Sequence, residues 1–275
     1  DDRATRESNE TGPNRHEELM SFIPPELIAL GQVILIDLVL AGDNAIVVGL
    51  AASRVAPELR SQVIFWGIAG AVGLRIAFAA VTTQAYVEMA RAGYGSVAEF
   101  HYVHHDPAGR PYQDPGELAL RVAGAARIAG LGLTLLPVFY AHAGFGGTPP
   151  VAGQRRFVHT PHSFARVVER LVAATDGDDV VVGVAPHSLR AVTPDELREV
   201  VALAPSGAPV HIHVAEQMRE VDDCVAWSGR RPVEWLLDHA RVDARWCLVH
   251  ATHMTAAELR AAAATGAVTG LAPTT

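Results

Sequence analysis

The sequence predicts an α/β protein, an incomplete (β/α)₈ barrel preceded by an α-helical transmembrane hairpin. Two long apolar stretches near the N-terminus predict the hairpin. Beyond residue 82, short β-branched segments alternate with amphipathic helical segments, and histidines follow several of the β segments. We therefore expect a disordered acidic tail over residues 1–25, a membrane hairpin over residues 26–82 and a truncated barrel over residues 83–275.

The composition excludes two broad classes of protein. The 275 residues include 22 Lys+Arg and 30 Asp+Glu, and this net charge of -8 argues against nucleic acid as a partner. Cys224 and Cys247 lie in unrelated sequence contexts, which excludes a disulfide-stapled secreted protein and favours a reducing compartment. The sequence gives no indication of the oligomeric state.

Two apolar stretches, residues 27–52 and 62–81, are each long enough to cross a bilayer. Apolar residues surround each predicted helix, and Gly67, Gly70 and Gly73 suit close helix contact in lipid. Buried helices of a soluble domain are the alternative. We expect contact with the lipid bilayer through residues 27–81 and a membrane location for the chain.

A polar cluster interrupts the first apolar stretch. Asp37 and Asn44 project from one helix face, Asp43 lies nearby, and such oxygen ligands suit a hard divalent cation. Neutralisation of one aspartate by Arg75 is an open alternative. The segment ILIDLVLAGDNAIVVGLAA and the later LRIAF resemble the first two helices of TerC-type integral membrane proteins, over residues 20–81. That resemblance implies metal-ion transport, for which a TerC protein uses further membrane spans.

The remaining chain alternates between strand and helix patterns. Candidate strands lie at residues 96–104, 133–140, 180–187, 209–216, 246–252 and 267–273. Two of the intervening helical segments, TPDEL and TAAEL, begin with a threonine followed three residues later by a glutamate, which indicates a capping box. This alternation predicts parallel βαβ units. No Gly-rich turn follows any strand, so a barrel is favoured over a Rossmann sheet.

Polar residues gather at the carboxyl ends of these predicted strands. They are His101, Tyr102, His104, His105, His187, Arg190, His211, His213, Glu216, His250 and His253. In a (β/α)₈ barrel, the strand carboxyl ends and the loops after them form the active site. We therefore expect several of these side chains to converge.

The residue types indicate a hydrolytic site. His213 could bind a metal while Glu216 transfers protons for a bound water, and His250 could hydrogen-bond that water or a tetrahedral oxygen. His187 with Arg190 could polarise a substrate and bind its carboxylate, a structural ion pair being the alternative.

Other histidines are expected to have no chemical role. His105 and His253 are predicted at the surface or behind the site, and His159 and His162 at the start of a helix.

Several longer segments resemble one enzyme family. AEFHYVHHDPAGRPY, VGVAPHSLRAVTPDEL, PVHIHVAEQ and EVDDCVAWSGRRPVEWLLDHA are similar to the formimidoylglutamate deiminases, zinc enzymes of the amidohydrolase superfamily in histidine degradation. The resemblance covers residues 84–275 and implies a small-molecule substrate, N-formimino-L-glutamate. Its products in that family are N-formyl-L-glutamate and ammonia.

The resemblance also implies residue roles. His213 would be a zinc ligand, and Glu216, His250 and His187 would be catalytic. Two further residues would hold the glutamate portion of the substrate, namely Tyr102 and Arg190.

The sequence departs from the deiminase pattern at both ends. The family's His-x-His pair of zinc ligands does not occur before His211, and its final aspartate ligand does not occur before Thr275. With one expected ligand, His213, we predict impaired zinc binding and impaired activity. A TerC-like membrane fragment and a chimeric chain with no coherent activity are the alternatives. A cytoplasmic location is the alternative for the deiminase part.

Overall fold

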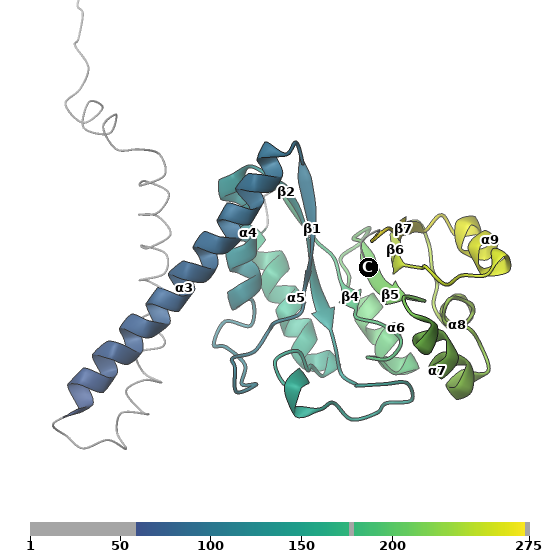
Figure 1. Cartoon of the computed structure of the whole chain (residues 1–275), viewed down its shortest axis with the longest axis horizontal. Helices are drawn as coiled ribbons and strands as arrows, with labels where there is room; N and C mark the ends of the chain where they lie inside the picture. Colours follow the sequence, from purple (N-terminus) through teal and green to yellow (C-terminus); the bar gives the residue numbers. More distant parts are fainter. Residues whose placement is uncertain (1–58, 176–178, 273–275) are drawn as a thin grey trace, which may run out of the picture. The chain divides into compact units, whose positions relative to one another are not determined.

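The computed structural model describes residues 59–175 and 179–272 (Figure 1). Contacts within the chain divide it into two compact units, residues 1–81 and residues 82–275. The predicted acidic tail, the first apolar stretch and its polar cluster of Asp37, Asp43 and Asn44 lie outside the described residues.

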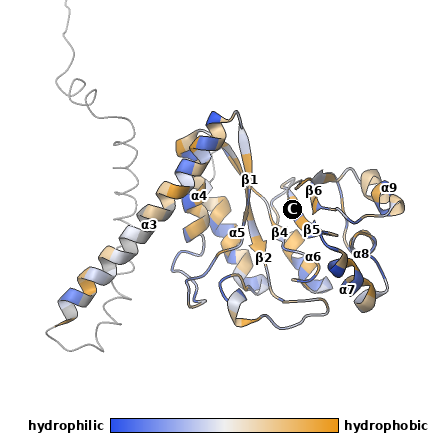
Figure 2. Cartoon of the chain, in the orientation of Figure 1, coloured by the Kyte–Doolittle hydropathy of each residue, from blue (hydrophilic) through white to orange (hydrophobic). Residues whose placement is uncertain are grey.

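Helix α3, Arg60–Arg91, contains the second apolar stretch. In the part of the chain that the structure describes, no helix is both long and apolar enough to cross a membrane. The predicted transmembrane hairpin is therefore not supported. The sequence of α3 places Arg75 within the apolar stretch and continues into polar residues such as Gln84 and Glu88. Figure 2 shows hydrophilic residues toward both ends of α3.

The described strands of the second unit are parallel. They are β1 Ser96–His101, β2 Gly132–Phe139, β3 Val180–Val182, β4 Ala185–Pro186, β5 Val210–Val214, β6 Trp246–His250 and β7 Val268–Gly270. One sheet has the order β1-β2-β3, with β4 also paired to β2, and the other has the order β5-β6-β7. Bridges from Val184 to Val210 and from Ser188 to His213 connect the two sheets. Neighbouring strands therefore follow one another in the order of the chain, as expected for the wall of a (β/α) barrel.

Helices separate the strands, as the sequence predicts. They are α4 Glu117–Ala129, α5 Pro161–Thr175, α6 Pro194–Ala202, α7 Met218–Ser228, α8 Pro232–His239 and α9 Ala256–Ala264, with a short 3₁₀ helix, η2, at Ala152–Gln154. Both predicted capping boxes form. The Thr193 side chain accepts a hydrogen bond from the Glu196 backbone in α6, and Thr255 does the same for Glu258 in α9.

The main core lies between the strands and the helices that follow them. Phe139, Ile212, Trp246 and Leu248 are fully or almost fully buried in one cluster. Alternation along β5 buries Val210, Ile212 and Val214, and it leaves His211 and His213 partly exposed on the other face. This alternation places His213 where it can contribute to a site.

Candidate active site

Three predicted histidines converge from three neighbouring strands. His187 follows β4, His213 lies in β5 and His250 ends β6. The ring centroids of His187 and His213 are 5.1 Å apart, and those of His213 and His250 are 5.3 Å apart. The carboxyl ends of parallel strands meet at one edge of a sheet, which explains this convergence.

The backbone at this edge adopts an unusual conformation. Ala215, His250 and Ala251 have φ values of 51°, 67° and 49°, in the left-handed region that non-glycine residues rarely occupy. The Ala251 backbone N–H donates to Val214 O at 3.0 Å, which holds the end of β6 against β5. Such strain is concentrated at functional sites in many proteins. No pattern in the sequence indicated it.

Hydrogen bonds and burial fix the state of His213. Its Nδ1–H and its backbone N–H both donate to His187 O, each at 3.0 Å, so Nε2 keeps the lone pair. Burial lowers the pKa of His213, and burial with the nearby His213 lowers the pKa of His187 to about 3. Both imidazoles are therefore neutral at pH 7.

Glu216 lies between a histidine and an arginine. Its Oε1 is 3.6 Å from His250 Nε2, and its Oε2 is 3.7 Å from Arg190 Nη2. Both distances exceed hydrogen-bond length. The carboxylate is therefore close to both groups without being bound tightly by either.

Glu220 is a buried acidic residue that the sequence patterns do not predict as part of the site. Its carboxylate accepts hydrogen bonds from the backbone N–H groups of Ala215 and Glu216, at 3.1 and 3.0 Å. It also lies 4.0 Å from Arg190 Nη2. Glu220 therefore fixes the turn that carries Glu216. Its position in the sequence could have indicated this role, because Glu220 lies in the first turn of α7, where the backbone N–H groups favour a nearby carboxylate.

Aromatic rings border the histidines. The Phe100 ring is 4.3 Å from that of His213, and the Tyr102 and Tyr140 rings are 6.4 and 4.9 Å from that of His187. Tyr102, predicted to bind substrate, therefore lies in this group. Tyr140 was not predicted, although it too follows a strand, β2. Burial raises the pKa of Tyr140.

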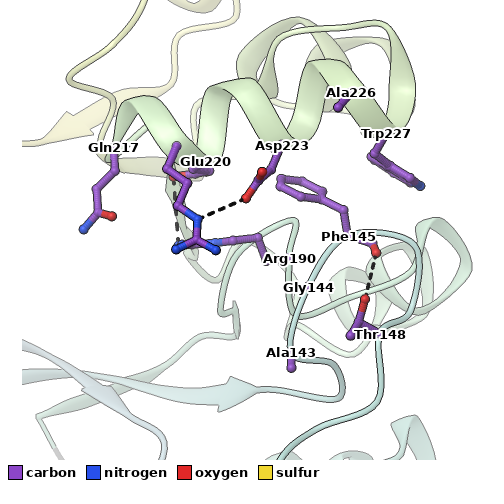
Figure 3. A pocket seen from close by; sticks show the side chains of 11 residues that line it. Ala143, Gly144, Phe145, Thr148, Arg190, Gln217, Glu220, Asp223, Ala226 and Trp227 are labelled. Carbon is purple, nitrogen blue, oxygen red and sulfur yellow. Dashed lines mark hydrogen bonds and ion pairs between the residues drawn. The ribbon is translucent and has the colours of Figure 1, made fainter.

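A cavity of about 640 Å³ adjoins Arg190. Figure 3 shows Glu220, Asp223 and Trp227 on α7 at one side of the cavity, and Phe145 on the loop that also carries Gly144 and Thr148. The Phe145 and Trp227 rings stack with their centroids 5.4 Å apart. Arg190 therefore has room beside it for a small molecule.

The described residues do not form a zinc site on their own. A zinc site uses four ligands, or three protein ligands and a water. Among residues 59–175 and 179–272, no group of three or more His, Cys, Asp and Glu side chains could hold a metal ion. His213 offers a free Nε2, but His187 and His250 do not complete a ligand set with it.

Comparisons with known proteins match both parts of the chain. The model of the amidohydrolase family matches residues 76–272, and that of the integral membrane protein TerC family matches residues 23–100. Formimidoylglutamate deiminase of Pseudomonas aeruginosa is 56% identical over 191 residues, which are 70% of this chain and 42% of that protein. The resemblance of the two segments to these two families is therefore confirmed.

Solved structures support the fold. A crystal structure of an amidohydrolase from Brucella melitensis is 54% identical, with a TM-score of 0.69, over 76% of this chain and 48% of that one. An adenosine deaminase from Xanthomonas campestris with bound zinc is 25% identical, with a TM-score of 0.53, over 70% of this chain and 38% of that one. This chain thus spans less than half the length of these relatives. Its second unit has an amidohydrolase-type fold, and the chain belongs to the amidohydrolase family.

Proposed function

We propose that the amidohydrolase part of the chain hydrolyses a C–N bond of N-formimino-L-glutamate, which gives N-formyl-L-glutamate and ammonia. The observation that carries this proposal is the Glu216 carboxylate, 3.6 Å from His250 Nε2 and 3.7 Å from Arg190 Nη2, beside two neutral imidazoles. The 56% identity to a formimidoylglutamate deiminase supports the choice of substrate.

Glu216 is suited to move the protons of this reaction. Water adds to the formimino carbon while Glu216 accepts one proton from that water and passes it to the formimino nitrogen. The Glu216 carboxylate then takes the remaining hydroxyl proton, as the carbonyl forms, and gives it to the leaving nitrogen. The C–N bond breaks and ammonia leaves. His250 Nε2, on the Oε1 side of Glu216, can donate a hydrogen bond to the oxygen that gains charge.

Arg190 and Tyr102 are suited to bind the glutamate portion. The contacts of Arg190 with Glu216 and Glu220, at 3.7 and 4.0 Å, are longer than hydrogen bonds, so its guanidinium can turn to a substrate carboxylate. Tyr102 lies beside His187, and the neutral His187 ring can hydrogen-bond the substrate nitrogen. Residues 59–175 and 179–272 offer no group of three or more side chains that could hold a zinc ion. We expect the isolated chain to be much slower than a complete deiminase.

An ammonia-release assay tests this proposal. The purified chain is incubated with N-formimino-L-glutamate, with and without added zinc, and ammonia is measured by a coupled enzyme. We expect slow release from the unaltered chain and at least a ~100-fold loss in E216Q, because general acid–base catalysis contributes about that factor or more.

The matched control is E199Q, since Glu199 is an exposed glutamate of α6. This variant should keep the rate of the unaltered chain. Absence of ammonia above the buffer background, from a chain that circular dichroism shows to be folded, would contradict the proposed activity of this chain. A chimeric chain without coherent activity would then be the better description.

A second proposed role is attachment to a membrane, which the TerC family match over residues 23–100 favours. Cell fractionation tests it: we expect the full chain in the membrane pellet after an alkaline carbonate wash. Recovery in the supernatant would contradict membrane attachment and favour a cytoplasmic deiminase part. Cation binding by Asp37, Asp43 and Asn44, and with it metal-ion transport, stays a prediction.

A further inference from the structure

A second group of histidines lies apart from the candidate active site. The histidine cluster consists of His101 at the end of β1, His104 and His105 just after it, and His159 just before α5. Ring centroids are 5.4 Å apart for His101 and His104, 4.7 Å for His104 and His159, and 4.8 Å for His105 and His159. Only 4 to 6% of His101, His104 and His159 is exposed. His105 and His159 are among the histidines predicted to have no chemical role.

Hydrogen bonds show that the cluster suits uncharged imidazoles. His104 Nε2–H donates to Val138 O at 3.2 Å, and His105 Nε2–H donates to Val158 O at 2.9 Å. The buried ring nitrogens without a hydrogen-bond partner are His101 Nε2, His105 Nδ1 and His159 Nε2. Protonation of a second nitrogen on such a ring creates a buried N–H without an acceptor, which is costly.

The surrounding charges give little compensation for protonation. Glu99 Oε1 lies 3.8 Å from His101 Nδ1, and Glu99 Oε2 accepts a hydrogen bond from Tyr86. The cationic Arg166 of α5 lies near His159. The cationic Arg156 donates a hydrogen bond to the backbone oxygen of His105. The nearby Asp106 carboxylate is already bound by Arg110.

Burial and the neighbouring imidazoles act in the same direction. They lower the pKa of His104 well below its ordinary value. They also lower the pKa of His159 to about 3, with burial as the larger cause.

The histidine cluster fastens the segment that carries Tyr102. The backbone N–H groups of His104 and His105 both donate to Arg156 O, each at 3.1 Å. Tyr102 lies between His101 and His104 in the sequence, and its ring packs 4.9 Å from that of Phe157. Release of residues 102–111 from residues 155–159 would therefore move Tyr102 away from His187.

We propose that the histidine cluster is a pH-sensitive contact, which positions Tyr102 beside His187 while the His104 and His159 imidazoles are uncharged and releases residues 102–111 in acid. Only the role of Tyr102 in substrate binding rests on the proposed function. A released histidine takes up a proton below pH ~6.5, whereas a docked one does not. For each such histidine, the equilibrium constant for release rises about 10-fold for every pH unit by which the pH falls from 6.5 toward the lowered pKa. His104 and His159 together therefore raise the equilibrium constant for release about 100-fold per pH unit.

Hydrogen exchange of the full chain, measured by mass spectrometry, tests this proposal without any assay of activity. Protection of residues 102–111 is compared with that of β2 at pH 7.5 and pH 5.5, after correction for intrinsic exchange rates. At pH 5.5 we expect the protection of residues 102–111 to be about 100-fold lower than at pH 7.5, since the lower pH is one unit below the pKa of a free imidazole. Protection of β2 should change far less.

Variants separate titration from a general effect of acid. H159F keeps an aromatic ring but cannot be protonated, and H104Q keeps a donor for Val138 O; each should reduce the loss to about 10-fold. H162F, at an exposed position of α5, is the matched control and should keep the ~100-fold loss. Equal losses in residues 102–111 and β2, or an unchanged loss in both H104Q and H159F, would overturn the proposal. Failure to release ammonia would leave this result unaffected.

Discussion

Replacement of Glu220 by alanine is expected to lower the free energy of unfolding by about 3–5 kcal/mol. Glu220 is 1% exposed, and its carboxylate accepts the backbone N–H groups of Ala215 and Glu216. Its removal leaves the buried N–H of Ala215 and the partly buried N–H of Glu216 without this acceptor, and takes a negative charge from beside Arg190. Urea denaturation followed by tryptophan fluorescence measures the loss.

The control is E199A, which removes an exposed glutamate of α6. It should change the free energy of unfolding by no more than about 0.5 kcal/mol. A loss below about 1 kcal/mol in E220A would show that Glu220 does not hold the turn before Glu216 in the way described.

Replacement of Gly183 by alanine is expected to lower the free energy of unfolding by about 3 kcal/mol. A Cβ atom at Gly183 would lie 2.4 Å from Pro209 O and 2.9 Å from Leu136 Cδ2. Because Pro209 O belongs to the backbone before β5, the two sheets would have to separate. Thermal and urea unfolding of G183A measure the cost.

Gly124 provides the matched control, since a Cβ there would have no neighbour within 4 Å. It lies inside α4, so G124A should stabilise the protein by about 0.5–1 kcal/mol. Equal stabilities of G183A and the unaltered chain would contradict the close approach at Gly183.

Local patterns predicted the second unit well, with errors at places where distant segments meet. The candidate strand at residues 246–252 matches β6 closely, and both capping boxes form, because these features depend on nearby residues. The candidate strand at residues 180–187 is instead divided into β3 and β4. Gly183 lies at the division, where its N–H donates to Leu135 O and the next residue bonds to Pro209 O.

The predicted membrane hairpin shows the limit of apolar runs as evidence. Apolar residues over residues 62–81 predicted a span, but in the described part of the chain no helix meets the requirement for one. Helix α3 extends beyond this stretch to Arg91, through polar residues such as Gln84 and Glu88. The TerC resemblance itself depends on specific residues and was confirmed by the family match.

Sequence patterns alone predict the βα alternation and the gathering of His187, His213 and His250, because the parallel order of strands brings their carboxyl ends to one edge. Two other features become visible only in the folded chain. Glu220 accepts hydrogen bonds from the backbone N–H groups of Ala215 and Glu216, and His104 and His159 are buried side by side. Burial and hydrogen-bond partners depend on segments far apart in the chain, and local spacing carries no information about them.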